Sequence, residues 1–263
     1  MGGRSETVRL TANFKLDGPD ALVEPLFSTY RAMVNELLAY AHARGITGFR
    51  RLKAEKYREF RARWPGLPSH YIYTACQMAC SAYRAFRKLK KRGRAKADKP
   101  VFRKDVIMLD DHLFALDLEE WTVSIAVPSG RVKFRLLHGE YHGKFRRMRA
   151  GQAWLVRRGS ELWLKVVFRT EVELREPDGR ALAVDVNENN ITVASPSGFR
   201  QIRTGERPIR TAYFLKRRRI QSALGRGKLR ARLMAKYRGR ERNRVRDIHH
   251  QLANEVVRQA LAE

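Results

Sequence analysis

The stretch ALAVDVNENNITVAS, residues 181–195, holds the carboxylate whose setting most strongly suggests chemistry. Apolar residues run into Asp185, polar turn-forming residues follow, and a second apolar run begins at Ile191. The pattern predicts a hairpin, with Asp185 near the end of a first, buried strand. A buried carboxylate is costly unless it is paired or bound to a metal ion. Asp185 is therefore the candidate catalytic residue and metal ligand.

Three kinds of site share this pattern. An apolar strand that ends in Asp and is followed by a polar turn and a second apolar strand is typical of ribonuclease-H-like nucleases. Their Asp binds Mg²⁺ in a two-metal site that cleaves phosphodiesters. The same pattern occurs in actin-like ATPases and in hairpins whose strand-end Asp is merely solvated. The pattern alone does not choose between these three.

The charge of the chain points to its partner. The sequence has 55 Lys and Arg against 27 Asp and Glu, a formal net charge of +28. Solubility calls for a charge of only about 2–8, so a polyanion is the economical explanation, and nucleic acid is the commonest one. The cations gather at the end of a predicted helix over 69–93 and between residues 203 and 246, where seventeen Lys or Arg stand against Glu206 and Glu241. The candidate nucleic-acid-binding residues are Arg84, Arg87, Lys88, Lys91, Arg92, Lys216, Arg217, Arg218, Arg219, Arg226, Lys228, Arg230, Arg232, Lys236, Arg238, Arg240, Arg242, Arg244 and Arg246.

The elements that position these residues follow from hydrophobic periodicity. Residues 7–16 alternate as a strand, and helical spacing predicts three helices between residues 19 and 99. Short apolar runs between residues 105 and 174 predict an antiparallel sheet, a small barrel that the helices interrupt. After the hairpin, FRQIR predicts a third strand, and two long basic helices break near Gly225. The expected fold class is α+β.

Composition also excludes several classes. No run approaches the ~18 apolar residues of a membrane span, and the N-terminus lacks the pattern of a signal peptide. We therefore expect a cytoplasmic protein with no membrane partner. Cys76 and Cys80 lie one helical turn apart and are expected to be buried thiols, because a zinc site would need two more ligands. No zinc is expected in this chain.

Several segments carry a family resemblance. LPSHYIYTACQMACSAYRAF resembles a recognition-lobe helix, and KPVFRKDVIMLDDHLFALD with VSIAVPSGRVKFRL and AWLVRRGSELWLKVVFRTEVE resembles a wedge barrel. ALAVDVNENNITVAS resembles a first RuvC motif, and the Arg-rich helices with RNRVRDIHHQLANEVVRQA resemble what precedes a second one. Together they resemble the OrfB/TnpB family of insertion-sequence transposases, RNA-guided nucleases related to type V CRISPR effectors.

The resemblance implies an architecture and a function. Residues 1–18 and 100–176 would form the wedge β-barrel, residues 19–99 the helical recognition lobe, and residues 177–263 a partial RuvC-like nuclease domain with basic helices. A guide RNA would pair with target DNA while the protein holds the heteroduplex by its backbone. Asp185 takes the place of the catalytic Asp, with Mg²⁺ as the cofactor.

The departures from the family set further expectations. The family's second and third RuvC carboxylates and its paired CxxC ribbon are not found in these 263 residues, so we expect a truncated member that is not catalytic alone. This interpretation also allows a C-terminal partner chain, or self-association of the chain. Two alternatives stay open: a nuclease-dead, guide-RNA-dependent DNA-binding regulator, and a general RNA- or DNA-binding protein.

Overall fold

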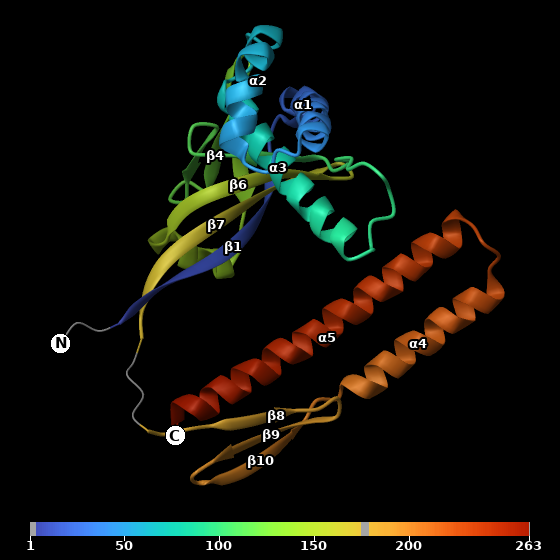
Figure 1. The fold of residues 1–263 in the computed structure, drawn as a ribbon. Helices are drawn as coiled ribbons and strands as arrows, with labels where there is room; N and C mark the ends of the chain where they lie inside the picture. Colours follow the sequence, from blue (N-terminus) through green and yellow to red (C-terminus); the bar gives the residue numbers. More distant parts are fainter. Residues whose placement is uncertain (1–3, 175–178, 263) are drawn as a thin grey trace. The chain divides into compact units, whose positions relative to one another are not determined.

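The structure, a computed structural model, describes residues 4–174 and 179–262. It divides into two compact units, Met1–Leu174 and Arg175–Glu263, which we call the N-terminal and C-terminal units (Figure 1). The domain boundary expected between residues 176 and 177 lies outside the described residues. Each unit is described by itself.

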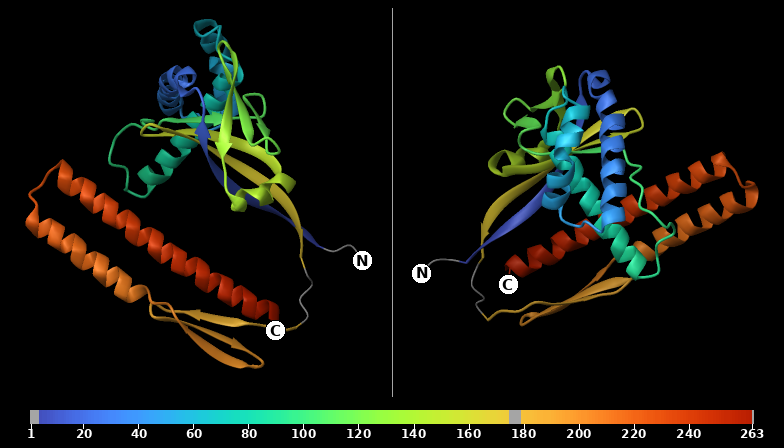
Figure 2. Two further views of the ribbon diagram at one scale, coloured as in Figure 1. Left: turned by 180° about the vertical axis from the view of Figure 1, so that it is seen from behind. Right: turned by 45° about the horizontal axis from the view of Figure 1, so that its top comes forward.

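The N-terminal unit is built on one antiparallel sheet of seven strands in the order β2-β6-β7-β1-β5-β4-β3. The strands are β1 (Ser5–Asp17), β2 (Val106–Leu109), β3 (Phe114–Asp117), β4 (Thr122–Val127), β5 (Gly130–Leu137), β6 (Arg149–Arg158) and β7 (Glu161–Glu173). A short 3-10 helix, η2 (Glu140–Arg147), connects β5 to β6. The sheet curls into a nearly closed barrel-like structure, seen from two further sides in Figure 2.

Period-two alternation explains how this sheet encloses a core. Phe14 of β1 lies opposite Leu164 of β7, and Ala12 lies opposite Val166. All four side chains are buried, as is Phe168 further along β7. The first strand of the chain is therefore held in the middle of the sheet by strands that follow more than 110 residues later.

Three helices are inserted between β1 and β2. A short 3-10 helix, η1 (Asp20–Leu22), precedes α1 (Glu24–Arg44), which is followed by α2 (Phe49–Arg63) and α3 (His70–Lys91). Gly45 ends α1 in the left-handed conformation at φ 66°, which glycine adopts without a steric cost. The helices and the sheet share one continuous hydrophobic core, and the Tyr71 hydroxyl of α3 donates a hydrogen bond to the carbonyl of Ala126 in β4.

The C-terminal unit is smaller and more open. It consists of β8 (Ala183–Val186), β9 (Asn190–Ser195), β10 (Gly198–Arg203), α4 (Glu206–Ala223) and α5 (Lys228–Ala262). The three strands are antiparallel in the order β10-β9-β8. Ile191 and Val193 of β9 pack against Leu252 of α5, and these are the members of the unit's buried cluster.

Much of the expected order of elements is confirmed. The fold is α+β, the early strand pairs with strands of the later sheet, and three helices separate them. The hairpin, its third strand and two long helices that break near Gly225 are present as well. Across the described residues, no helix is long and apolar enough to cross a membrane.

The prediction that the first strand of the hairpin is buried was wrong. All four residues of β8 are exposed, and Val186 retains 69% of its accessible surface. The reason is position, because β8 is an edge strand and only β9, in the middle of the sheet, contributes buried residues. The sequence pattern of a strand does not reveal whether other elements cover it.

Candidate nucleic-acid interface

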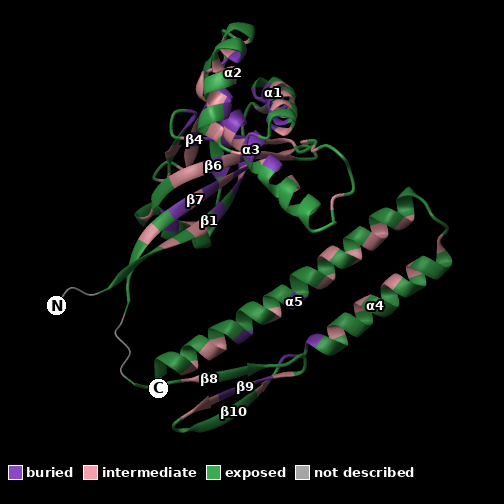
Figure 3. Ribbon diagram, in the orientation of Figure 1, coloured by how far each residue is buried: buried purple, intermediate pink, exposed green. Residues whose placement is uncertain are grey.

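The two basic helices of the C-terminal unit form a long hairpin. α4 and α5 run side by side and are joined by the short segment 224–227, and most of their surface is exposed (Figure 3). Toward its end, α5 instead rests on the three-stranded sheet, where Ile248, Leu252 and Val256 meet β9. The part of the hairpin that carries most of its cations is thus held away from the small core.

The two acidic residues of the basic segment hold the hairpin together. Glu206, at the start of α4, is buried and accepts hydrogen bonds from Arg210 and, at 2.7 Å, from Nε2 of His249 in α5. Glu241 of α5 accepts a hydrogen bond from Arg217 of α4, and its other oxygen lies 4.0 Å from Arg210. Both carboxylates therefore connect the helices and are already used inside the molecule.

The environment of Glu206 favours its ionised form. Burial is the largest single influence and would raise the pKa of this carboxyl group, but the hydrogen bonds and positive charges of His249 and Arg210 together outweigh it. The net effect is a pKa below the ordinary value for glutamate. The contact of Glu206 with His249, which joins α4 to α5 and which we call the Glu206 clamp, therefore depends on a charged carboxylate.

Most of the predicted cations of this unit face solvent. Of the fourteen, Arg217 is paired with Glu241 and Arg230 is half-buried, with a hydrogen bond to the carbonyl of Leu224. The other twelve are exposed, and no carboxylate of the described residues lies within ion-pair distance of them. They are Lys216, Arg218, Arg219, Arg226, Lys228, Arg232, Lys236, Arg238, Arg240, Arg242, Arg244 and Arg246.

The spacing of these cations on α5 is unfavourable for an isolated helix. Lys228, Arg232, Lys236, Arg240 and Arg244 follow one another at intervals of four residues, which makes each a neighbour of the next. Like charges at this spacing destabilise a helix by about 0.2–0.5 kcal/mol per pair. A bound polyanion would remove that repulsion, so the row favours a partner with many negative charges.

The cations of α3 border a groove in the N-terminal unit. A hollow of about 540 Å³ is lined by Arg84, Arg87, Lys88, Lys90, Lys91, His42, Thr47, Tyr83 and Phe86. His42 meets Tyr83 and Phe86 edge-on, with ring centroids 5.7 and 5.6 Å apart. Four of the five predicted residues of α3 thus converge, and Arg92 is exposed but outside the lining. Tyr83 is buried in the core, but His42 and Phe86 are half-buried beside the cations. Partly exposed rings beside cations suit a nucleic-acid strand, because bases stack on rings while phosphates pair with cations.

Lys90 belongs to the same run of cations at the end of α3 and also lines the groove. Two further lining residues could not be associated with these cations from the sequence. His42 and Thr47 come from the end of α1 and the loop after it, about forty residues earlier than the cations. Arg84 donates a hydrogen bond of 3.0 Å to the carbonyl of Thr47, which fixes this loop against α3. Only the packing of α1 on α3 brings these residues together.

Asp185 has a simpler environment than the sequence suggested. It is exposed on β8, lies opposite Thr192 of β9, and accepts a hydrogen bond of 2.8 Å from the side-chain amide of Asn187. Within residues 4–174 and 179–262, Asp185 belongs to no group of three or more metal-ligating side chains. A two-metal site needs several carboxylates, so the described residues do not fit such a site and no cleavage step follows from them.

The two cysteines are buried and free, as expected. Burial raises the pKa of the Cys76 thiol to about 12, and burial also raises the pKa of Cys80. Metal ions bind the thiolate form, so neither side chain is disposed to act as a ligand.

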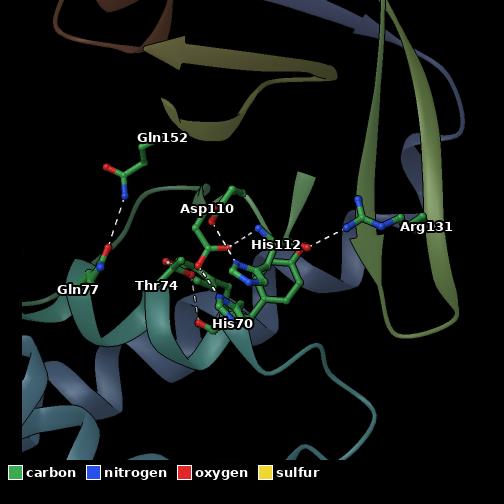
Figure 4. A network of polar contacts seen from close by, with 10 residues as sticks. His70, Thr74, Gln77, Asp110, His112, Arg131 and Gln152 are labelled. Carbon is green, nitrogen blue, oxygen red and sulfur yellow. Dashed lines mark hydrogen bonds and ion pairs between the residues drawn. The ribbon is translucent and has the colours of Figure 1, made fainter. Parts of the chain in front are cut away.

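One cluster of potential metal ligands could not be predicted from the sequence. His70, Asp110 and His112 of the N-terminal unit have ligand atoms within 4.8 Å of one another (Figure 4). His70 lies forty residues before Asp110, in a different predicted element, so no local spacing marks the group. The only local signal is the run Asp110-Asp111-His112 directly after a strand.

Comparisons with known proteins found similarity to proteins described only as uncharacterized. Residues 26–126 match a family described as the uncharacterized protein MJ0013 family. The chain is also 24% identical over 230 residues to the uncharacterized protein MJ0857 of Methanocaldococcus jannaschii, an alignment that covers 76% of this chain and 82% of that protein. Neither description states an activity, so the function rests on the geometry above.

Proposed function

We propose that this chain is a nucleic-acid-binding protein of the OrfB/TnpB type, which holds a guide RNA by its sugar–phosphate backbone. The observation that carries this proposal is the α4–α5 hairpin. Its two acidic residues are already engaged in contacts between the helices, while twelve cations remain exposed without a carboxylate partner among the residues that the structure describes. Such a surface is costly to maintain for its own sake, and phosphate contacts would stabilise it.

The many exposed cations support a protein that contacts the sugar–phosphate backbone of RNA rather than the edges of its bases. Backbone grip requires many cations at a steady spacing, whereas base reading requires a few amide or guanidinium groups aimed at base edges. The hairpin offers the first kind. The groove at α3 adds the half-buried ring of Phe86 beside its cations, a combination suited to a single-stranded or looped segment.

The order of elements supports the finer assignment. In this proposal the seven-stranded sheet is the wedge barrel, α1–α3 form the recognition lobe, and β8–β10 with α4 and α5 form part of a RuvC-like domain. A guide RNA held across these parts would pair with target DNA. Binding is the activity that we assign to the described residues, because Asp185 is exposed and belongs to no group of three or more metal-ligating side chains among them.

A second candidate function is general binding of RNA or DNA. The observation that favours it is the wide distribution of the cations, since the fixed charge of a phosphate backbone is common to every nucleic acid. The two candidates differ in selectivity. A guide-RNA-binding protein distinguishes structured RNA from duplex DNA, and a purely electrostatic binder does not.

The test is a set of charge-neutral variants read out by binding of a fluorescent structured RNA. We replace Arg238, Arg240, Arg242 and Arg244 of α5 with glutamine. The matched control loses the same charge from exposed positions of the N-terminal unit, Arg50, Arg58, Arg103 and Arg169. We expect the α5 variant to bind at least tenfold more weakly and to lose about one unit of salt slope per phosphate contact removed. An equal effect of both variants would show that net charge, rather than the hairpin, accounts for binding.

A further inference from the structure

The cluster of His70, Asp110 and His112 joins two parts of the N-terminal unit. His70 is the first residue of α3, whereas Asp110 and His112 directly follow β2. Nδ1 of His70 lies 2.7 Å from Oδ2 of Asp110, and the two imidazole rings stack with their centroids 3.8 Å apart and 18° between their planes. Three side chains that can ligate a metal ion therefore converge across the seam between the helices and the sheet (Figure 4).

The surrounding contacts hold these side chains in place. The backbone amide of His112 donates a hydrogen bond of 3.2 Å to Oδ1 of Asp110, and the carbonyl of His112 accepts one of 2.9 Å from Arg131 of β5. On the other side, Tyr71, next to His70, is buried and bonded to the carbonyl of Ala126. The ligand atoms are thus supported from α3, β4 and β5, which reduces the cost of ordering them around an ion.

Asp111 completes the arrangement from outside. Its carboxylate oxygen lies 3.1 Å from Nδ1 of His112. A carboxylate that accepts a hydrogen bond from one imidazole N–H fixes the tautomer and leaves the lone pair of the other nitrogen for a metal ion. In His112 that second nitrogen is Nε2. His112 is exposed, so water can reach the cluster and complete a coordination shell.

The chemistry of the donors selects the ion. Two imidazoles and one carboxylate suit zinc and neighbouring first-row divalent ions, whereas Mg²⁺ and Ca²⁺ prefer shells of oxygen alone. Three protein ligands with an open position are also a common arrangement for zinc. We propose that His70, Asp110 and His112 bind one divalent transition-metal ion, with Zn²⁺ as the first ion to test, and that the ion fastens the start of α3 to the loop after β2.

This site shares no residue with Asp185 or with the candidate nucleic-acid-binding cations, and it departs from the expectation of no zinc, which rested on the two cysteines alone. An ion that binds the folded chain and not the unfolded chain stabilises the fold by mass action. At an ion concentration a hundredfold above Kd, the unfolding midpoint of a unit of this size should rise by about 5–10 °C.

The experiment titrates the purified, chelator-treated full chain with Zn²⁺, and with Co²⁺ as a spectroscopic probe. We expect one bound ion per chain, a Co²⁺ spectrum of nitrogen and oxygen ligands without thiolate bands, and a higher unfolding midpoint. His112→Ala and Asp110→Asn should each weaken binding at least tenfold, whereas His250→Ala, which removes an exposed histidine of α5, should leave it unchanged.

Two outcomes would overturn the proposal. The first is a wild-type chain that binds no Zn²⁺ or Co²⁺, which would make the cluster a polar clamp only. The second is a variant with Asp110→Asn and His112→Ala that binds as tightly as the wild type. Because a ligand variant could also unfold, far-UV circular dichroism of each apo protein is recorded. If the variants do not fold, the wild-type Co²⁺ spectrum and the chelator-reversible midpoint shift decide.

Discussion

The two units of this chain bury apolar side chains to very different extents. The N-terminal unit has one continuous core that includes Phe14, Phe134 and Phe168 and extends from the sheet into all three helices. The buried cluster of the C-terminal unit consists of Ile191, Val193 and Leu252, with four partly buried neighbours. The first unit is therefore stabilised mainly by hydrophobic burial, whereas the second depends on the ion pairs that join α4 to α5.

The C-terminal unit also exposes large apolar side chains and many cations to solvent. In the C-terminal unit, Val186, Phe199 and Leu261 are exposed by 69%, 80% and 74%, and the unit also carries twelve exposed cations without a carboxylate partner among the described residues. A unit with little core, exposed apolar groups and repelling charges gains more from a partner than a unit with a complete core does. We therefore propose a division of roles, in which the N-terminal unit, with its complete core, provides the frame and the C-terminal unit is ordered further by the nucleic acid proposed above.

The largest expected effect concerns the cores. Phe168→Ala should destabilise the N-terminal unit by about 3–5 kcal/mol, because it removes a fully buried ring from close packing. Val193→Ala, a smaller truncation in the buried cluster of the C-terminal unit, should cost about 1–3 kcal/mol. Denaturant unfolding is monitored with two probes that report on the units separately. Tryptophan fluorescence reports on the N-terminal unit, and proteolysis between residues 203 and 230 reports on the C-terminal unit. A single transition shared by both probes and shifted equally by both variants would contradict the comparison.

The next effect concerns the Glu206 clamp. Its pKa is lowered in the folded state, so its contribution to the unfolding free energy is complete above the unfolded pKa of about 4.3 and is lost as the pH falls through the lowered folded value. Glu206→Gln should therefore reduce the stability of the C-terminal unit at pH 6 by about 1–3 kcal/mol and have much less effect near pH 3.

The measurement is unfolding of wild type and Glu206→Gln across this pH range. Glu59→Gln is the control, since its pKa is also lowered, with the hydrogen bond from Lys56 as the main cause, but it lies on the surface of α2 in the other unit. If Glu206→Gln and Glu59→Gln changed the pH dependence of proteolysis between residues 203 and 230 equally, Glu206 would have no special role in the α4–α5 hairpin.

The smallest effect concerns repulsion along α5. Arg240→Gln removes two like-charge contacts at four-residue spacing, with Lys236 and Arg244, and should stabilise the free C-terminal unit by about 0.4–1 kcal/mol. Bound RNA should reverse the sign, because the same residue then contacts phosphate. Unfolding with and without RNA checks both signs, and Arg58→Gln in α2 provides the control. Destabilisation of the RNA-free chain by Arg240→Gln would show that the row is not under repulsive strain.

Local patterns were enough to predict most elements. The alternation around Phe14 identified β1, and Gly45 and Gly225 marked the ends of helical segments correctly. These predictions succeeded because side-chain periodicity and glycine conformation act within a few residues.

The sequence was less informative wherever distant segments meet. It predicted a buried strand at Asp185, because apolar residues alone do not show which strand lies at an edge. It did not associate His42 with Arg84, or His70 with Asp110, because those contacts depend on the packing of α1 and β2 against α3. Charge density identified the basic helices, but only the structure shows that Glu206 and Glu241 are used between them.

The central claim is that the exposed cations serve structured RNA rather than polyanions in general. The most direct test titrates the full chain, at one fixed salt concentration, with a structured RNA, a duplex DNA of equal length and heparin, and repeats each titration at a second salt concentration. Our account predicts tightest binding to the RNA, with a log–log salt slope that reflects several phosphate contacts at about 0.7–0.9 each. Equal affinity for all three polyanions would contradict the account and leave only nonspecific electrostatic binding.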